Sequence, residues 1–399
     1  MGSGLSRHIL LIPSWYATAA NPVRGSFFRE QALALARAGH RVGVIAPNLR
    51  SVRELPAGLA GAARGIALRD DDGVPTYGLE GAQLLPGLKP ANDRAWVLAG
   101  RKLFARYVAE QGQPDILHAH ATFMGGIIGA QLKRESGVPL VITEHSTVYQ
   151  RRPIPEFQLR EARSALTESD ARLVVSPQLG ESMERVIGPE ACPWEWVPNM
   201  VDSAFLAAEV PASRPPGPFR FLNVAFLQEK KGHPELLAAF AQRFAGDRSV
   251  ELRIGGDGPQ REALREMATS LGIAEQVVWL GALDRAGVLA EMLAADAFVL
   301  SSLIETFGVV VVEALACGVP VVATRSGGPE CIIGDGDGLL VPAADSTALG
   351  EAMERLKLDR ADYDSHAIRR RCAERFGEAA LVGALDRVYA RISAEGEDS

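Results

Sequence analysis

Two glutamates in the last third of the chain are placed where their carboxylates can bind a polar ligand. Glu305 and Glu313 lie in the segment Ser301–Gly328, SSLIETFGVVVVEALACGVPVVATRSGG, and seven residues separate them. Glu305 precedes an expected helix that begins near Phe307, and Glu313 lies two turns into that helix. A carboxylate at such a position can accept two hydrogen bonds from a vicinal diol, for example that of a ribose.

The start of the same helix is an expected anion site. The backbone N–H groups of Phe307, Gly308 and Val309 have no helical partner and lie at the positive end of the helix dipole. Gly308 also removes a Cβ where a phosphate must approach closely. The polar loop that ends at Thr306 leads directly into this start. The segment therefore predicts a site for a diphosphate.

A purely structural interpretation of the two glutamates is also available. Glu305 would cap the helix, and Glu313 would be a surface charge. The neighbours of Glu313 favour a bound carboxylate, because Val309–Val312 and Ala314–Ala316 are residues of the buried type. A charge among such residues is rarely left without a partner.

Further polar residues follow expected strands in the first half of the chain. Gly25 and Ser26 stand at the start of a helix and form a second candidate anion site, although an ordinary strand–helix turn would look the same. His120 follows the strand Asp115–His118, and Glu144 and His145 follow the next strand. A single histidine there is as readily explained by a structural role.

The elements that must position these residues alternate between short apolar strands and helical patterns. In the first half the expected order is strand 8–12, helix 26–38, strand 41–46, a Gly- and Pro-rich stretch 47–90 of short strands and loops, helix 92–111, strand 115–118, helix 124–135, strand 139–143, helix 156–168, strand 172–175, helix 178–187 and strand 194–197. Such alternation indicates βα units and a parallel sheet.

The pattern then restarts after residues 203–218, which are rich in Ala, Pro and Ser and are expected to form a linker. The second half shows strand 220–224, helix 233–244, strand 250–254, helix 259–271, strand 277–280, helix 285–294, strand 297–300, helix 307–316, strands 320–323 and 338–341, and closing helices.

These patterns predict an α/β protein with two Rossmann-like, doubly wound domains facing a cleft. We expect an acceptor-side domain over residues 1–200 and a donor domain over 201–375, with a C-terminal helix at about 376–395 that packs back on the first domain. Ligands of open parallel sheets bind beyond the carboxyl ends of the strands, where the candidate residues lie.

Bulk composition excludes several classes of protein. The 399 residues are 47% hydrophobic, enough for two cores, and the net charge of −7 argues against nucleic-acid binding. Residues 1–198 carry 22 Lys and Arg against 19 Asp and Glu, and residues 199–399 carry 20 against 30. The basic first half could face an anionic lipid or acceptor, or could arise by chance. Four scattered cysteines indicate a reducing compartment, and neither a signal peptide nor a membrane span is expected.

The segment Ser301–Gly328 resembles the signature of glycosyltransferase family 4, retaining enzymes with the GT-B fold. The matching positions are Ser302, Glu305, Phe307, Gly308, Glu313, Ala314, Gly318, Pro320–Thr324, Gly327 and Gly328. The resemblance implies that Glu305 lies at the donor sugar, that the amides of Thr306–Val309 hold the diphosphate, and that Glu313 binds the ribose.

The resemblance extends over nearly the whole chain. The stretch 22–31, PVRGSFFREQ, is similar to the family's amino-terminal donor-phosphate loop, particularly in the branch that includes teichuronic-acid biosynthesis transferases. The same resemblance implies that His120 lies beside the transferred sugar. It also implies that Glu144 and His145 face the acceptor.

In the second domain the resemblance makes Lys231 the phosphate-binding lysine. Phe226 stands where the family has an arginine, so one diphosphate-binding cation is missing. Either Lys230 or Arg24 is expected to compensate.

The loop that contains Gly256 is expected to line the donor site. Leu280 and its neighbours are expected to offer backbone groups to the base. Val197–Asp202 is similar to the family's Pro-Asn-Gly-Val-Asp stretch, with Met200 in place of the glycine.

Two acidic stretches imitate the Asp-x-Asp metal motif of the other major transferase fold. Both Asp70–Asp72 and Asp335–Asp337 lie in Gly-flanked sequence and are interpreted as solvated turns. We therefore expect neither a cofactor nor a metal held by the protein, and no nucleic-acid partner.

The sequence thus predicts a retaining hexosyltransferase that uses a nucleoside diphosphate sugar, UDP-linked by base rate, with GDP-mannose as the main rival. The acceptor would be a hydroxyl group of a sugar, a lipid-linked glycan or a small molecule in cell-surface polysaccharide, glycolipid or glycoconjugate synthesis. Catalysis would involve His120, Glu305 and Lys231. A cytoplasmic location is expected, either free or peripheral at the inner membrane face. Alternatives are a non-catalytic nucleotide-sugar-binding homologue, and an epimerase or phosphorylase on the same fold.

Overall fold

The computed structural model describes residues 6–17, 25–51, 65–83, 89–151, 153–188, 192–211 and 216–397. The chain forms two compact units. Unit 1 comprises residues 1–175, 180–197 and 382–399, and unit 2 comprises 176–179 and 198–381. The main division at residues 197 and 198 lies three residues before the expected boundary, directly after the last strand of unit 1.

Unit 1 is an α/β domain whose elements follow the expected alternation. In chain order they are β1 (His8–Pro13), α1 (Ser26–Arg37), β2 (Arg41–Ser51), β3 (Gly65–Asp71), β4 (Val74–Gln83), α2 (Lys89–Gln111), β5 (Ile116–His120), the π-helical turn η1 (Thr122–Gly126), α3 (Ile127–Ser136), β6 (Leu140–Glu144), α4 (Val148–Arg151), α5 (Glu156–Glu168), β7 (Ala171–Val174), α6 (Pro177–Ile187) and β8 (Glu195–Trp196).

The sheet of unit 1 has the strand order β3-β4-β2-β1-β5-β6-β7-β8. All neighbouring pairs are parallel except β3 and β4, which form an antiparallel hairpin around the turn at Asp72 and Gly73. The expectation of short strands and loops over residues 47–90 was therefore partly wrong. Strand β4 has ten residues and pairs with the extended end of β2, so alternating Gly and polar residues concealed a regular strand.

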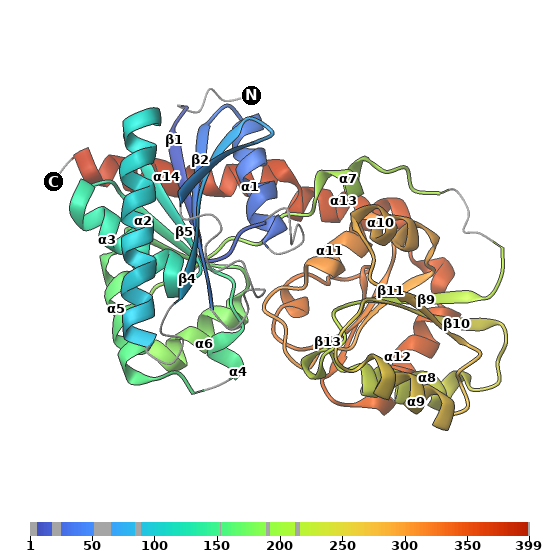
Figure 1. Ribbon diagram of the computed structural model, residues 1–399. Helices are drawn as coiled ribbons and strands as arrows, with labels where there is room; N and C mark the ends of the chain where they lie inside the picture. Colours follow the sequence, from blue (N-terminus) through green and yellow to red (C-terminus); the bar gives the residue numbers. More distant parts are fainter. Residues whose placement is uncertain are drawn as a thin grey trace. The chain divides into compact units, whose positions relative to one another are not determined.

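Helices cover both faces of this sheet. Figure 1 shows α2, α3 and α5 side by side in front of the sheet and α14 (Glu378–Glu397) behind it. The carboxyl-terminal part of α14 belongs to unit 1, where Asp386 Oδ1 lies 3.0 Å from His40 Nε2. The C-terminal helix expected at about 376–395 is α14, which begins after α13 (Ser365–Phe376) ends and Gly377 intervenes.

Unit 2 is a second α/β domain. Its elements are α7 (Ser203–Ala207), β9 (Phe219–Val224), η3 (Glu229–Lys231), α8 (His233–Phe244), β10 (Val250–Gly255), α9 (Arg261–Ser270), β11 (Val277–Gly281), α10 (Arg285–Ala294), β12 (Ala297–Leu300), α11 (Val309–Ala316), β13 (Val321–Arg325), η4 (Pro329–Cys331), β14 (Gly338–Pro342), α12 (Ser346–Leu358), η5 (Arg360–Asp362) and α13.

The sheet of unit 2 is fully parallel, with the order β11-β10-β9-β12-β13-β14. Phe221, Phe240 and Phe244 lie in the core between the sheet and its helices. The stretch 203–218, expected to be only a linker, begins with α7. Asp202 caps that helix by accepting a hydrogen bond from the amide of Ala204, and Phe205 is buried.

Each sheet has a point at which the strand order reverses. In unit 1 this point lies between β1 and β5, and in unit 2 it lies between β9 and β12. Loops that leave adjacent strands in opposite directions open a crevice there, at the carboxyl ends of the strands. The next residues after β5 and β12 are therefore well placed to meet a ligand.

Candidate functional site

The reversal point of unit 2 brings together two of the predicted catalytic residues. Lys231 follows β9 and Glu305 follows β12, and the Lys231 Nζ atom lies 2.5 Å from Glu305 Oε2. The two side chains are only 15% and 13% exposed. Seventy-four positions separate the two residues, so this ion pair exists only because β9 and β12 are neighbours in the sheet.

Backbone contacts hold these two loops in register. The amide of Leu303 donates to the carbonyl of Lys230 at 2.8 Å, and the Ser301 hydroxyl donates to the carbonyl of Lys231 at 2.9 Å. Gly232 adopts φ 64°, and a Cβ there would lie 2.0 Å from the Ser301 carbonyl oxygen. Only glycine therefore allows the two loops to approach this closely.

His233, which sequence reasoning missed, begins α8 directly after this glycine. Its ring is fully buried, and neither ring nitrogen has a hydrogen-bond partner within the described part of the chain. Burial and the nearby Lys231 lower the pKa of His233 to about 4, so the ring is neutral at physiological pH. Its position two residues after Lys231 in the sequence was the available signal.

Helix α11 begins two residues later than expected. Val309 is its first residue and Gly308, with φ 100°, precedes it. Phe307 is not part of the helix; its buried ring packs edge-to-face against Phe376 with ring centroids 5.9 Å apart. Thr306 is also buried. The N–H groups at the start of an α-helix have no intrahelical acceptor, so the predicted anion site moves toward Val309 and Val310.

Glu313 is buried inside unit 2, with a side chain only 2% exposed. Its Oε1 accepts a hydrogen bond from Arg285 Nη1 at 2.6 Å. Arg285 also donates to Asp202 at 2.8 Å through Nη2 and lies over the ring of Phe205. Burial raises the pKa of Glu313, and the Arg285 guanidinium opposes that effect. Glu313 is thus no surface charge.

Arg285 is the most informative residue that sequence reasoning missed. The sequence required a partner for a carboxylate among apolar residues, but it did not identify which one. Arg285 is the first residue of α10, after the N-cap Asp284, and has the appearance of an ordinary helix-surface arginine. Only the packing of α10 beside α11 connects it to Glu313.

Gly256 directly follows β10, and Leu280 lies within β11, the edge strand that pairs with β10. A Cβ at Gly256, which has φ 139°, would lie 1.9 Å from the carbonyl oxygen of Ala225, so the loops after β9 and β10 touch through their backbones. The register of β11 against β10 passes from Trp279 to Gly281. Leu280 is the additional residue of this bulge, which removes its backbone from the regular ladder.

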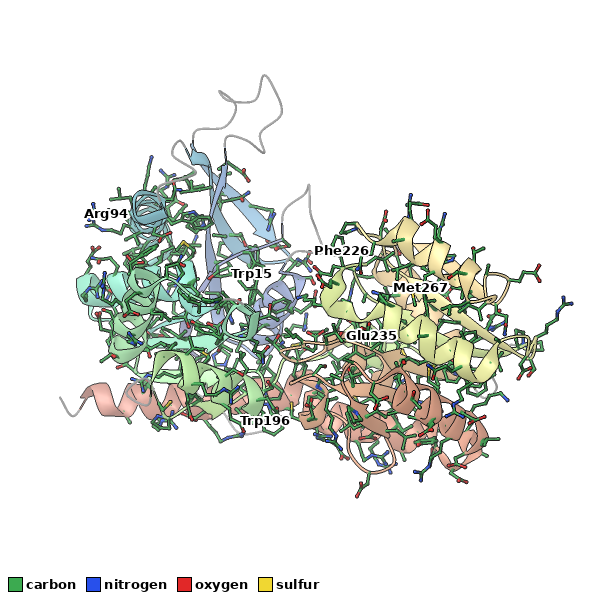
Figure 2. The ribbon with its side chains drawn as sticks, turned by 90° about the horizontal axis from the view of Figure 1, so that it is seen from below. Trp15, Arg94, Trp196, Phe226, Glu235 and Met267 are labelled. Atoms are coloured by element: carbon green, nitrogen blue, oxygen red, sulfur yellow. The ribbon has the colours of Figure 1, made fainter. Side chains whose placement is uncertain are left out.

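Phe226 occupies the position at which an arginine was expected. The side chain lies at the surface of unit 2, 57% exposed (Figure 2). It follows β9 within the same loop as Lys231. Lys230 is half-buried, and Arg24, the other residue expected to replace the cation, lies outside the described residues.

In unit 1, Gly25 and Ser26 stand at the start of α1 as expected. Gly25 has φ 77° and ψ 21°, and its carbonyl accepts from the amide of Phe28. Trp15, which follows β1, packs against Phe28 with ring centroids 5.4 Å apart. The candidate helix start therefore lies beside the loop that leaves β1.

His120 is the last residue of β5, and it is buried rather than open. Its ring lies between His118, Phe28 and His145, with ring centroids at 4.4, 4.7 and 5.3 Å. Burial, together with the two neighbouring histidines, lowers the pKa of His120 well below its usual range. Nδ1 lies 3.1 Å from His145 Nε2, whereas Nε2 has no hydrogen-bond partner in the described segments.

His118 connects this cluster to the end of the chain. Its Nδ1 lies 2.7 Å from the hydroxyl of Tyr389 in α14, and its Nε2 lies 2.7 Å from the Thr143 hydroxyl. Burial lowers the pKa of His118 to about 3. The stacked rings of His118 and His120 are therefore both neutral, and Tyr389 of α14 fixes the orientation of the His118 ring.

Glu144, which was expected on the acceptor side, is held by backbone amides inside unit 1. It is fully buried and accepts hydrogen bonds from the amides of Thr122, His145 and Ser146, at 2.7 to 2.9 Å. Burial raises the pKa of Glu144, and the three amide hydrogen bonds lower it. The carboxylate thus joins the loops after β5 and β6, and it positions His145 beside His120.

Both Asp-x-Asp stretches lie at turns with exposed aspartates, as expected, but at least one aspartate of each is paired rather than solvated. Asp71 accepts a hydrogen bond from Arg29 at 2.8 Å, and Asp337 is buried and pairs with Arg371 at 2.6 Å. Both are structural ion-pair partners. Among the described residues there is no group of three metal-ligating side chains, and no helix is long and apolar enough to cross a membrane.

Comparison with known proteins identifies the family. The family model for glycosyltransferase family 4 matches residues 25–205, and the model for glycosyl transferases group 1 matches residues 209–376. The D-inositol 3-phosphate glycosyltransferase of Pseudarthrobacter chlorophenolicus is 31% identical over 307 residues, covering 71% of this chain and 69% of that protein. The chain belongs to glycosyltransferase family 4.

Other relatives of this glycosyltransferase match over a greater length. Glycogen synthase of Mycobacterium tuberculosis is 28% identical over 396 residues, covering 95% of this chain and 94% of that protein. Phosphatidyl-myo-inositol mannosyltransferase of Mycolicibacterium smegmatis is 30% identical, covering 90% and 87%. The similarity to the teichuronic-acid branch stays a prediction.

Solved structures support the GT-B fold of the glycosyltransferase. Sucrose-phosphate synthase from Thermosynechococcus elongatus superposes with a TM-score of 0.75 at 22% identity, covering 98% of this chain and all of that one. HepE of Anabaena in complex with UDP gives 0.71 at 19% identity, covering 96% of this chain. The expected pair of Rossmann-like domains is confirmed.

Proposed function

We propose that this glycosyltransferase transfers a hexose-type sugar from a UDP-sugar to a hydroxyl acceptor, with retention at the anomeric carbon. The Lys231–Glu305 pair at the reversal point of unit 2 carries the proposal. It places a cation and a carboxylate in the same crevice, beside the loop that leads into α11. That combination suits a ligand with both an anionic diphosphate and a sugar.

Stabilisation of the departing diphosphate is the main effect that the reaction needs. The amides at the start of α11 and the ammonium group of Lys231 would supply it. Both are held before the substrate arrives, and preorganised donors need no reorganisation as charge develops. When the diphosphate binds, Lys231 would exchange part of its contact with Glu305 for a phosphate oxygen. Glu305 would then be available to a sugar hydroxyl.

Two parts of unit 2 would recognise the nucleotide: the Glu313–Arg285 pair and the bulge at Leu280. Glu313 would accept hydrogen bonds from the ribose, and Arg285 would hold its carboxylate in position and ionised. The bulge at Leu280 would present backbone groups to the base. Gly256 would line the site because its lack of a side chain lets the two neighbouring loops close together.

The sugar would be positioned by Glu305 and His120. The Nε2 atom of His120 has no partner in the described residues, so a sugar hydroxyl could provide its missing hydrogen bond. A neutral ring at physiological pH suits this positioning role better than proton transfer. The departing phosphate would then act as the base for the incoming hydroxyl.

GDP-mannose is the second candidate donor, because one relative of similar length is named as a mannosyltransferase. The named relatives include enzymes of glycogen, D-inositol 3-phosphate and phosphatidyl-myo-inositol, so soluble and lipid acceptors are both represented. We infer a role in cell-surface polysaccharide, glycolipid or glycoconjugate synthesis, in the cytoplasm and at the inner membrane face.

A donor panel tests the proposal. Thermal unfolding is measured with UDP-glucose, UDP-galactose, UDP-N-acetylglucosamine and GDP-mannose, because a ligand that binds the folded state raises its apparent stability. Stabilising donors then enter a transfer assay with wild type and Lys231→Ala. A UDP-sugar that stabilises and is consumed by wild type supports the proposal. Stabilisation without transfer or hydrolysis would instead indicate a binding homologue.

A further inference from the structure

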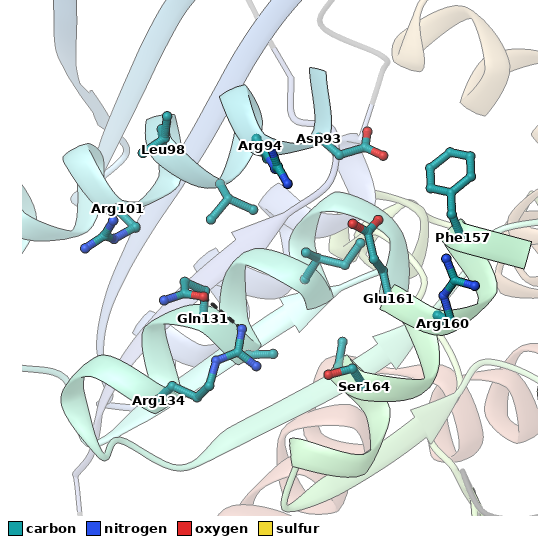
Figure 3. Close-up of a pocket in the computed structure, with 14 residues that line it drawn as sticks. Asp93, Arg94, Leu98, Arg101, Gln131, Arg134, Phe157, Arg160, Glu161 and Ser164 are labelled. Atoms are coloured by element: carbon teal, nitrogen blue, oxygen red, sulfur yellow. Dashed lines mark hydrogen bonds between the residues drawn. The ribbon is translucent and has the colours of Figure 1, made fainter. Parts of the chain in front are cut away.

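A groove of about 790 Å³ lies on the helical face of unit 1, between α2, α3 and α5 (Figure 3). Its charges are balanced, because the carboxylates of Asp93 and Glu161 lie beside the guanidinium groups of Arg94 and Arg160. A groove without an excess of either charge does not select a charged ligand. A polar atom that can select a ligand lies instead at the carboxyl edge of the sheet, in the histidine cluster around His120.

Two neighbouring rings fix the plane of the His120 ring. His118 stacks on it with ring centroids 4.4 Å apart and an interplanar angle of 27°, and Phe28 packs against it at 4.7 Å. His118 is itself held in place, because the hydroxyls of Tyr389 and Thr143 each lie 2.7 Å from one of its two nitrogens. The nitrogens of His120 therefore point in fixed directions.

One of these nitrogens faces His145. The His120 Nδ1 atom lies 3.1 Å from His145 Nε2, and both rings are buried. Glu144 holds the backbone of His145 by accepting its amide at 2.9 Å, and Phe27 and Phe28 pack against the His145 ring. Two imidazole nitrogens form a hydrogen bond only if one carries a proton and the other a lone pair. The contact therefore couples the tautomers of the two rings.

The burial of His120 decides which nitrogen carries the proton. Burial and the neighbouring histidines lower the pKa of His120 well below its usual range, so the ring is neutral and has a single proton. A proton on Nε2 would be a fully buried donor without an acceptor in the described residues. A proton on Nδ1 is shared with His145 and leaves only a lone pair at Nε2. Buried donors without an acceptor are rarer in proteins than buried acceptors without a donor, so the Nδ1–H tautomer is favoured.

We propose that His145 is a positioning residue that holds the proton of His120 on Nδ1, so that Nε2 accepts a hydrogen bond from a hydroxyl of the transferred sugar. The assignment rests on the proposed function for the identity of this ligand. A site built to receive a hydroxyl rejects an analogue that lacks it, because its own polar group is then left unpaired. His145 thus contributes to sugar specificity without touching the sugar, since it keeps the Nε2 lone pair available.

Nitrogen-15 NMR of the full-length, histidine-labelled protein tests the assignment, because a ring nitrogen with a proton and one with a lone pair resonate far apart. We expect His120 to carry its proton on Nδ1 in wild type, with its signals assigned by their loss in His120→Ala. His145→Leu removes the acceptor, so the proton should distribute over both nitrogens. His145→Gln keeps an amide oxygen that can accept it, so the proton should stay on Nδ1. A wild-type ring protonated on Nε2 would overturn the assignment.

Steady-state kinetics with the nucleotide sugar used by wild type separate positioning from packing. His145→Leu should lower kcat/KM about tenfold or more, and His145→Gln should retain most of the wild-type value. UDP binding should be unchanged in both variants, because UDP has no sugar to meet His120. Equal losses in the two variants would indicate a packing role and would refute the proposal.

His40→Gln is the matched control. His40 is another buried histidine of unit 1 and pairs with Asp386, but it precedes β2 and so lies at the opposite edge of the sheet from His120. Its replacement should leave kcat/KM and the His120 tautomer unchanged.

The tautomer and the transfer reaction are measured separately, so the two proposals can fail separately. If no nucleotide sugar is transferred while His120 carries its proton on Nδ1, the transferase proposal fails and the pairing with His145 stands. A series of donors that each lack one sugar hydroxyl gives the opposite case. One of them should bind wild type about tenfold more weakly than the parent donor, with a smaller loss in His145→Leu. Normal transfer with no such difference refutes the role of His145 alone.

Discussion

Replacement of Arg285 by alanine tests the most consequential contact in the candidate donor site. Arg285 donates a hydrogen bond to the carboxylate of Glu313, whose side chain is only 2% exposed. Its removal leaves a buried carboxylate without its charged partner, which is costly in a folded domain. We expect Arg285→Ala to destabilise the protein and to weaken donor binding.

The magnitude follows from the exposure of the two partners. A hydrogen bond to a charged group contributes about 1.5–3 kcal/mol to stability. Arg285 is 42% exposed, so water can partly replace it, and we take the lower limit of about 1.5 kcal/mol. In a domain of 150–250 residues that corresponds to a decrease in Tm of about 3–6 °C.

Proton binding gives the prediction a distinctive pH dependence. Burial already raises the pKa of Glu313, and the loss of Arg285 removes the interaction that opposes this shift. The folded variant then binds a proton that the unfolded chain releases at lower pH, so stability falls as the pH rises. The deficit relative to wild type should be larger at pH 8 than at pH 5.

A double-mutant cycle with Glu313→Gln isolates the contact. Arg285 also contacts Asp202 and Phe205, and these interactions are lost equally in both backgrounds. Thermal and urea unfolding at pH 5 and pH 8 give the coupling energy, which we expect to be about 1.5 kcal/mol at pH 8 and smaller at pH 5. Additive effects at both pH values would refute the argument, because they would mean that Glu313 gains nothing from Arg285.

Three further outcomes are expected. Glu313→Gln should weaken UDP binding about tenfold in isothermal titration, since about 1.4 kcal/mol of ribose hydrogen bonding would be lost; unchanged affinity would contradict the ribose assignment. Lys231→Ala should lower kcat/KM about 100-fold or more through both rate and affinity, whereas Arg248→Ala, at a side chain that is 90% exposed, should have no effect. Proton NMR of the product should show an α-linkage from an α-linked donor, and an inverted product would rule out the retaining class.

The α/β architecture was predictable because strand and helix periodicity are local properties of the sequence. The bounds of α5, α8 and α10 agree with the expected residues, and most strands agree within one or two. Short strands were expected over residues 47–90, but the hairpin β3–β4 was not, because neither strand alternates regularly between apolar and polar residues. An antiparallel strand pair at a sheet edge need not show a strong alternation of apolar and polar residues.

The residues of the candidate site were predictable individually, but their pairing was not. Lys231 and Glu305 were each assigned from the family resemblance, and only the order of β9 and β12 in the sheet shows that they form an ion pair. The apolar neighbours of Glu313 indicated that its carboxylate needs a partner, but the sequence did not show that this partner is Arg285. Glu144 was expected only on the acceptor side, and the sequence did not show that amides of the loops after β5 and β6 meet at its carboxylate.

The exposed ring of Phe226 changes how the donor site must work. At the position where the family resemblance implies an arginine, this protein has an uncharged side chain on the same loop as Lys231. The ammonium of Lys231 is itself paired with Glu305, so an incoming diphosphate must compete with an internal carboxylate. Among the described residues no carboxylate is bound to the amides at the start of α11. Their partial positive charge also does not depend on protonation. Diphosphate binding should therefore depend more on the backbone of α11 than it would with an arginine at position 226.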